Sequence, residues 1–161
     1  MSLQRELKKK GPFESLEQEA ILNLVRTSDQ YQIRFARLFR QHELTPSQYN
    51  ILRILQGEGA PLPVLEIASR TVTVVPGITG LIDRLERAGF VARKRCAEDR
   101  RVIYVALTEK GRKTLAVLNE PLRELHQTLI GHLAKTELKE LTGLLEKARG
   151  ALSAEPSDTC V

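Results

Sequence analysis

The stretch from residue 74 to residue 108 constrains the fold most, because it holds one helix pattern and two strand patterns in close succession. Its first apolar residues follow the i, i+3, i+4, i+7 spacing of an amphipathic helix: Ile78, Leu81, Ile82 and Leu85. Gly89 stands where a glycine with positive φ commonly ends a helix. A run of β-forming residues, a charged turn and a second strand pattern at 102–107 follow. This order predicts a helix-turn-helix with a wing and indicates a nucleic-acid partner.

The charge of the chain is concentrated in the same region. The 161 residues carry a net charge of +5, and their 42% of hydrophobic residues suffice for a folded core. Between residues 83 and 113, ten Lys and Arg stand against five Asp and Glu, so this window alone holds the whole surplus. A basic surface of this kind attracts phosphates. Aromatic residues are only 4% and Trp is absent, so we expect a core of Leu, Ile, Val and Ala.

Cysteine content and hydropathy favour a protein of the reducing cytoplasm. The two cysteines, Cys96 and Cys160, do not form a disulfide framework. No apolar run approaches the ~20 residues that span a bilayer, so we expect no membrane partner. The basic N-terminus lacks the apolar segment of a signal peptide.

The predicted fold class is mainly α with a small β wing, an α+β arrangement. Residues 1–15 are polar and indicate either a flexible N-terminal arm or a short docking helix. The segments 16–41 and 108–152 predict a helical dimerisation region. The segment 42–107 between them predicts the winged helix-turn-helix domain, and 153–161 a flexible tail.

Capping signals predict where the inner helices begin. Thr45 opens one helix, with Gln48 placed to complete a capping box. A short helix after it is expected to bury Leu65. Thr73 is the predicted cap of the recognition helix, and Thr108 caps the long helix after the wing.

The leucine-rich helices at both ends of the chain have no obvious second core to cover. A protein that recognises duplex DNA through one short helix usually binds as a dimer, so we predict a homodimer. The alternative, in which these helices pack only on their own domain, stays open. The predicted interface residues are Ile21, Leu24, Leu118, Leu122, Leu141 and Leu145.

The N-terminal end of the recognition helix is the part that enters the major groove. Gly77 and Gly80 each lower helix propensity by roughly 1 kcal/mol, which suggests close approach to DNA or close packing against another helix. Few long polar side chains lie at this tip, so DNA shape should carry much of the specificity. Arg87 has three alternatives: a phosphate contact, a solvated side chain, or an i,i+4 pair with Asp83. The predicted contact residues are Val75, Pro76, Gly77, Thr79, Gly80 and Arg84.

The charged turn after the first strand is the predicted tip of the wing. An arginine here can enter the minor groove, where the negative potential is strongest when the groove is narrow. Asp99 beside the arginines would weaken phosphate attraction unless it holds Arg101 in place. The predicted wing residues are Arg95, Asp99, Arg100 and Arg101.

Two segments together resemble the MarR family of bacterial transcriptional regulators. Residues 83–91 read DRLERAGFV, and residues 99–101 read DRR and lead into VIYVALTEKG. The resemblance covers about residues 18–152. It implies a winged-helix dimer that binds pseudo-palindromic operators, usually as a repressor that a phenolic or lipophilic anionic ligand releases from DNA. The ligand-pocket residues remain unknown.

The resemblance also assigns roles to single residues. It places Pro76, Gly77, Thr79 and Gly80 at the groove-reading tip. It implies a DNA-backbone contact for Arg84, a wing acid at Asp99 and a minor-groove arginine at Arg101. The chain departs from the family at 134–136, where Ala-Lys-Thr replaces a common Ser-Pro cap.

Three other functions compete with this interpretation. A redox sensor would use Cys96, which Arg95 could activate, but no resolving cysteine lies nearby. An enzyme is disfavoured, because the histidines show no metal-ligand spacing and no phosphate loop or nucleophile motif is present; the histidines are His42, His126 and His132. We therefore expect neither cofactor nor metal. A protein-docking winged helix would not need arginines on the wing.

Overall fold

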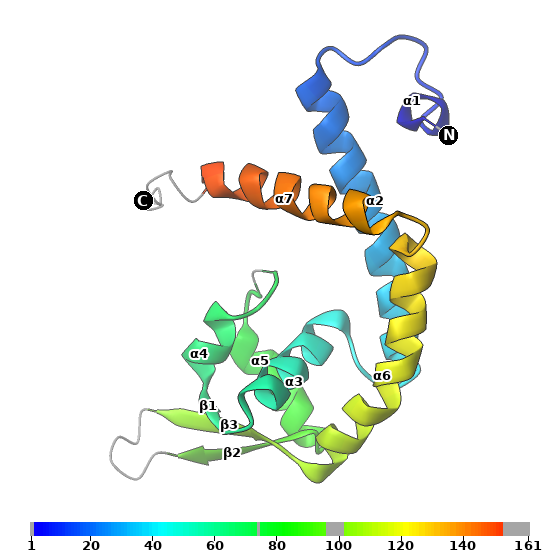
Figure 1. The fold of residues 1–161 in the computed structure, drawn as a ribbon. Coiled ribbons are helices and arrows are strands. Elements are labelled where there is room, and N and C mark those ends of the chain that lie inside the picture. Colours follow the sequence, from blue (N-terminus) through cyan, green and yellow to red (C-terminus); the bar gives the residue numbers. More distant parts are fainter. Residues whose placement is uncertain (1, 74, 96–101, 153–161) are drawn as a thin grey trace. The chain divides into compact units, whose positions relative to one another are not determined.

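The computed structural model describes residues 2–73, 75–95 and 102–152. The fold is mainly helical with one small sheet, which confirms the predicted class (Figure 1). The elements in order are α1 (Leu3–Glu6), α2 (Leu16–Arg40), α3 (Pro46–Glu58), β1 (Leu62–Pro63), α4 (Val64–Ser69), α5 (Ile78–Arg87), β2 (Val91–Arg95), β3 (Ile103–Leu107), α6 (Glu109–Ile130) and α7 (Lys135–Leu152). The sheet order is β1-β3-β2, with both pairs antiparallel.

The chain divides into two compact units within α6. The first unit extends to Leu122 and holds the sheet, and the second begins at Arg123 and holds α7. In the second unit, the Ala134 N–H donates to the Glu137 carboxylate at 2.7 Å. This contact supplies half of a capping box, so Glu137 supports the start of α7 although Ala134 has no capping side chain.

Side-chain caps hold the starts of three helices, and two of these caps, Thr45 and Thr108, were predicted from the sequence. The Thr45 hydroxyl accepts from the Gln48 N–H at 3.3 Å, and the Gln48 side chain accepts from the Thr45 N–H at 2.9 Å, so the capping box of α3 is confirmed. The Thr108 hydroxyl accepts from the Gly111 N–H at 3.1 Å at the start of α6. Ser15 plays the same part for α2, accepting from the Gln18 N–H at 3.1 Å.

The N-terminal segment contains a short helix that packs on α2. Leu3 of α1 is only 5% exposed, and Glu6 pairs with Arg26 at 3.7 Å. The Gln4 side chain donates to the Gly11 carbonyl at 3.1 Å, which folds the segment after α1 back on itself. Of the two alternatives for residues 1–15, the structure therefore has the docking helix over Leu3–Glu6.

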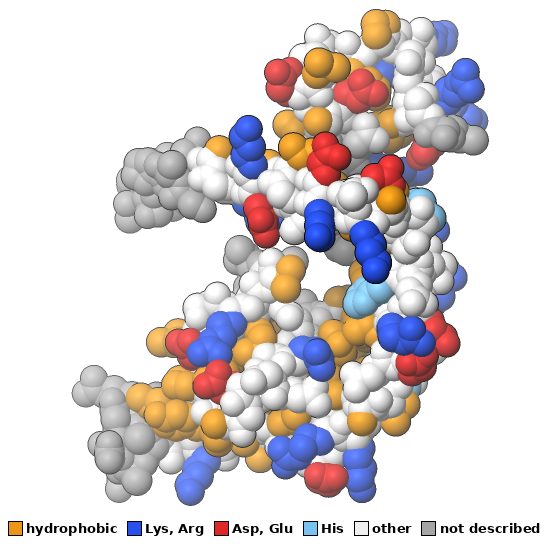
Figure 2. All heavy atoms as spheres, viewed as in Figure 1, with side chains coloured by type: hydrophobic (Ala, Val, Ile, Leu, Met, Phe, Trp, Pro, Cys, Tyr) orange, Lys and Arg blue, Asp and Glu red, His pale blue; other side chains and the backbone are white. Residues whose placement is uncertain are grey.

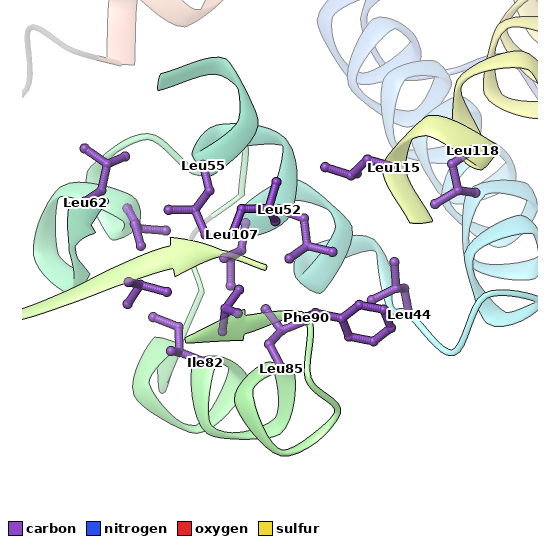
Figure 3. Packing of buried hydrophobic residues seen from close by; sticks show 14 of the residues in the cluster. Leu44, Leu52, Leu55, Leu62, Ile82, Leu85, Phe90, Leu107, Leu115 and Leu118 are labelled. Carbon is purple, nitrogen blue, oxygen red and sulfur yellow. The ribbon is translucent and has the colours of Figure 1, made fainter. Parts of the chain in front are cut away.

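One hydrophobic core joins the inner helices to the sheet (Figure 3). Side chains from α3, α4, α5, β3 and the first half of α6 point into it; the fully buried ones include Ile51, Leu52, Ile67, Ile82, Leu85, Val105, Leu115 and Leu118. Leu, Ile and Val dominate this core, as the low aromatic content predicts. Burying such side chains contributes about 1.5–3 kcal/mol each, so this cluster fixes α5 against the sheet.

The prediction that Leu65 is buried is wrong. Leu65 is 83% exposed, whereas Ile67 of the same helix is fully buried. Residues two apart do not share a helix face, and α4 has only six residues with which to cover the core. The end of α4 is tied to α3 by Arg70, which donates to Glu58 at 2.7 Å and to Glu66 at 2.8 Å. These hydrogen bonds raise the pKa of the Arg70 guanidinium above its ordinary value.

Candidate nucleic-acid interface

The recognition helix α5 begins later than the sequence predicts. Its first residue is Ile78, and its N-cap is Gly77 in the left-handed region at φ 68°, with no side-chain cap. The predicted cap Thr73 therefore does not serve α5. The residue before a proline is disfavoured in the helical region, which excludes Val75 from the helix and leaves Pro76 in a turn.

Helix α5 ends in a tight turn at Gly89, the glycine that the sequence predicts. Gly89 has φ 78°, and its N–H donates to the Glu86 carbonyl at 2.8 Å. The Phe90 N–H donates to the Leu85 carbonyl at 2.9 Å. These two bonds form a Schellman motif, whose hydrophobic contact comes from the buried Leu85 and Phe90. The motif turns the chain directly into β2.

The two faces of α5 differ sharply. Ile82 and Leu85 are fully buried in the core, as Figure 3 shows. The predicted contact residues lie mostly on the outside: Pro76, Gly77, Thr79, Arg84 and Arg87 are exposed, and Val75 and Gly80 are partly buried. These residues thus lie at one end and along the outer face of α5, whose apolar face is buried in the core.

Gly77 and Gly80, at the start of α5, are glycine for different reasons. A Cβ at Gly80 would meet no atom of the described residues within 4 Å beyond its own helix backbone and chain neighbours. Close packing within the described part of the chain therefore does not explain Gly80, and the close approach of DNA stays a prediction. Gly77 also has open space, but its φ of 68° requires glycine for a backbone reason.

Asp83 does not pair with Arg87 through their side chains. The Arg87 Nε–H donates at 3.4 Å to the backbone carbonyl of Asp83, while the carboxylate of Asp83 binds Arg93 of β2. The guanidinium of Arg87 therefore stays exposed beside Arg84 on the outer face of α5.

Arg93 is a residue that sequence reasoning missed, because it counted only as one more positive charge. Its guanidinium pairs with Asp83 and with Glu86 at 3.5 Å, and it donates to the Thr79 carbonyl at 3.1 Å. Its own N–H donates to the Glu86 carboxylate at 3.0 Å. Arg93 therefore joins the wing strand to α5. The spacing of its acceptors along one helix face is the sequence signal that could have revealed it.

The wing is a hairpin of β2 and β3 with exposed basic residues on its first strand. Arg95 pairs in register with Ile103, and both Lys94 and Arg95 are exposed. Figure 2 shows Lys and Arg side chains along the lower edge of the view, where the sheet and the start of α6 lie in Figure 1. The predicted wing-tip residues Asp99, Arg100 and Arg101, and also Cys96, lie outside the described residues.

The junction between the wing and α6 contains two structural residues without an assigned role in the sequence analysis. The Lys110 ammonium donates to the Ala88 carbonyl at 2.7 Å and lies 4.5 Å from the centre of the Phe90 ring. A Cβ at Gly111 would lie 2.5 Å from the Phe90 carbonyl oxygen, so only glycine fits there. This junction locks the start of α6 onto the end of α5.

The six predicted interface leucines and isoleucines fall into different environments. Ile21 and Leu24 are 59% and 45% exposed, and Leu122, Leu141 and Leu145 are partly buried. Leu118 is fully buried in the core of a single chain. It has no surface to offer a second subunit, and this part of the prediction is corrected. The reason is that the first half of α6 completes the core of the first unit.

No helix among the described residues is both long and apolar enough to cross a bilayer. The described residues also contain no cluster of three or more metal-ligand side chains.

Comparisons with known proteins agree with this geometry. The MarR family model matches residues 44–103. A crystal structure of a MarR transcription factor from Planctomyces limnophilus is 46% identical, covers 84% of this chain and 98% of its own, and has a TM-score of 0.66. The homoprotocatechuate degradative operon repressor of Escherichia coli is 29% identical over 70% of this chain and 76% of the repressor. The organohalide-sensing regulator RdhR, in its 2,4-dichlorophenol-bound form, shares the fold at 20% identity, with 89% and 87% coverage and a TM-score of 0.79.

Proposed function

Because this chain belongs to the MarR family of DNA-binding transcriptional regulators, we propose that it acts as a homodimeric repressor of a pseudo-palindromic operator. The family and the relatives of the chain are transcription factors, not enzymes. The proposed repressor works in the cytoplasm, where the chromosome is accessible. A small aromatic or lipophilic anionic effector would relieve repression.

The observation that carries the DNA-binding role is the outer face of α5. Its tip is a glycine turn with no bulky side chain, and Arg84 and Arg87 follow along the exposed face. Gly77 offers no side-chain cap, so no described side chain competes with an anion at the start of α5, where the Gly80 N–H already donates to the Gly77 carbonyl at 2.9 Å. We assign Val75, Pro76, Gly77, Thr79 and Gly80 to the major groove and Arg84 to a phosphate.

The wing supplies the second part of the proposed interface. Arg95 is exposed at the end of β2, and the residues after it lead to Asp99, Arg100 and Arg101. We propose that Arg101 enters the minor groove and that Asp99 aims it, while Arg95 and Arg100 contact phosphates.

Unpartnered apolar surface supports the homodimer. None of the residues of α7 is buried, and Leu144 of this helix is 59% exposed. On α2, Leu16, Ile21 and Val25 are all more than half exposed. Apolar surface on this scale commonly marks a protein interface. The proposed interface keeps Ile21, Leu24, Leu122, Leu141 and Leu145 and omits Leu118.

Two relatives support a ligand-relieved repressor. The Escherichia coli relative is named as the repressor of an operon that degrades homoprotocatechuate, an aromatic acid. RdhR, which shares the fold, was solved with 2,4-dichlorophenol bound. We propose that an effector of this chemical class shifts a two-state dimer toward a spacing of recognition helices that does not match the operator.

The test is selection of bound fragments from random duplex DNA, followed by binding titrations at several salt concentrations. A homodimer with two recognition helices should select half-sites about one helical turn apart, roughly 34 Å. Affinity should fall steeply with salt, because each neutralised phosphate contributes about 0.9 to the slope of log K against log salt. Phenolic acids added to the same titration should release the DNA.

Absence of binding to any duplex would contradict the proposal and favour a protein-docking module. If no phenolic or lipophilic anion weakens DNA binding, the proposed class of effector is contradicted, whereas the DNA-binding role is not.

A further inference from the structure

Arg93 differs from the basic residues that flank it along the wing. Its side chain is only 20% exposed, whereas Lys94 and Arg95 on the same strand are exposed. Its Nε atom is buried and has no hydrogen-bond partner in the described part of the chain. A cation held in this way is directed into the protein and is not available to DNA phosphates.

The partners of Arg93 lie along a single face of α5. One guanidinium nitrogen, Nη1, contacts the carboxylates of Asp83 and Glu86, the second at 3.5 Å. The other, Nη2, donates to the Thr79 carbonyl at 3.1 Å. The spacing of Thr79, Asp83 and Glu86 is i, i+4, i+7, so one planar group spans three successive positions of the helix face.

This arrangement resists rotation of α5 about its own axis. The guanidinium is a rigid fork, and its contacts hold the helix in the first turn and again one and two turns later. Thr79 belongs to the turn that the proposed function places in the major groove. A small rotation of the helix would displace the Thr79 side chain and Gly80 from the base edges while leaving the exposed charges free to reach phosphates.

We propose that Arg93 is a positioning residue for DNA recognition, which sets the rotation of α5 relative to the wing. It governs discrimination between the operator and other duplexes, and it does not contact DNA. This inference rests on the proposed function, since it assumes that α5 reads the major groove.

The experiment compares Arg93→Gln with Lys94→Gln in the full-length chain. Each variant loses one positive charge from β2, one from the inside and one from the outside. Affinity is measured on the selected operator and on a scrambled duplex across a salt series. For Arg93→Gln we expect operator affinity to fall about tenfold, scrambled-duplex affinity to stay within about twofold, and the salt slope to stay unchanged. For Lys94→Gln the ratio between the two duplexes stays that of the wild type.

Two further variants keep the test decisive if Arg93→Gln does not fold, as judged by circular dichroism and the melting midpoint. Asp83→Asn keeps the size of the side chain but removes the charged acceptor. Arg93→Lys keeps the charge but cannot span Thr79 and Glu86 with one ammonium. Both variants should lower the ratio of operator affinity to scrambled-duplex affinity. Adding Asp83→Asn to the Arg93→Lys variant should change this ratio little further.

Two outcomes overturn the inference. An equal loss on both duplexes, with the salt slope reduced by about 0.9, would make Arg93 a phosphate contact. An unchanged ratio in all folded variants would make the Arg93 cluster a packing feature only. By contrast, if the wild-type protein binds no duplex, the proposed DNA-binding function itself is contradicted.

Discussion

At the scale of single residues, three glycines of this chain have three different physical explanations. Gly77 has a left-handed backbone, and Gly111 leaves no room for a Cβ. Gly80 has neither constraint, because its φ is ordinary and the space beside it is open among the described residues. A helix residue that could be alanine without strain, yet is glycine, indicates a requirement outside the isolated chain.

Gly80→Ala should therefore separate stability from function. The free energy of unfolding should rise by up to about 1 kcal/mol, because alanine forms helix better than glycine. Operator affinity should fall by about 1–3 kcal/mol, because the added methyl group would lie where we propose that the helix approaches the bases. Thermal unfolding and operator titration measure the two effects.

Gly143→Ala is the matched control, since a Cβ there also meets nothing within 4 Å among the described residues. It lies in α7 and should raise stability without changing DNA binding. If Gly80→Ala also left operator affinity unchanged, the tip of α5 would not approach the bases closely.

Gly111→Ala should have the opposite effect on stability. Its Cβ would lie 2.5 Å from the Phe90 carbonyl oxygen and 2.7 Å from a methyl group of Leu107. We expect a loss of about 1–3 kcal/mol from overpacking, measured by denaturant unfolding. Unchanged stability would show that the start of α6 can shift away from β2 at little cost.

Arg101→Ala tests the proposed wing contact. Specific binding should weaken by about 1–3 kcal/mol, measured by titration with the operator at physiological salt. Replacing an A·T-rich minor groove by a G·C-rich one at the wing position should reduce the effect of the substitution, because the narrow groove supplies the potential that attracts arginine. An unaffected operator affinity would rule out the minor-groove assignment.

At the scale of elements, α5 is held at its end, along one face and on its apolar side. The Schellman motif at Gly89, the guanidinium of Arg93 and the buried pair of Ile82 and Leu85 each fix a different degree of freedom. The tip before Ile78 is built from small and apolar groups. In the major-groove position that we propose for it, such a tip would read base edges by shape and by apolar contact, since it has no long polar side chain to place there.

Uracil in place of thymine in the operator half-sites should weaken binding. Each methyl group in contact with Val75 or Pro76 should contribute about 0.8 kcal/mol, the value of one buried methylene. Competition titrations with singly substituted operators would locate these positions. Thymines outside the half-sites serve as controls, and equal affinity for all substituted operators would exclude apolar contact by this turn.

At the scale of the whole molecule, apolar residues remain exposed on the helices at both ends of the chain. Each of the two units presents such residues: Ile21 and Leu24 in the first, Leu144 and Leu152 in the second. A single chain leaves this surface in water, which is unfavourable by about 25 cal/mol per Å². Association of two copies is the arrangement that we propose to cover it.

Leu141→Glu should disrupt this association. A carboxylate in an apolar interface loses hydration without gaining a partner. Light scattering should report twice the 18.1 kDa chain mass for the wild type and a shift toward the single chain for the variant. Operator affinity should fall together with dimer content.

Lys139→Glu is the control, because Lys139 lies on the other side of α7 and is exposed. It changes the charge by two units, against one unit for Leu141→Glu, and should nevertheless leave the mass unchanged. A wild-type protein that scatters as a single chain at micromolar concentration would refute the homodimer.

Local patterns in the sequence determined the order of the elements and most of their ends. The capping box at Thr45, the glycine at Gly89 and the cap at Thr108 were predictable because each depends on hydrogen bonds between near neighbours. The amphipathic spacing in α5 likewise identified the face that the core buries. The resemblance of two short motifs then pointed to the family.

Only the tertiary structure decided which side chains of distant elements meet. Leu118 belongs to the core and Arg93 to the support of α5, because α6 and β2 pack against helices that the linear pattern does not place beside them. The start of α5 at Ile78 also escaped local reasoning, since several residues compete for the cap and the left-handed Gly77 settles it. Burial and charge pairing arise from three-dimensional neighbours, which spacing along the chain does not specify.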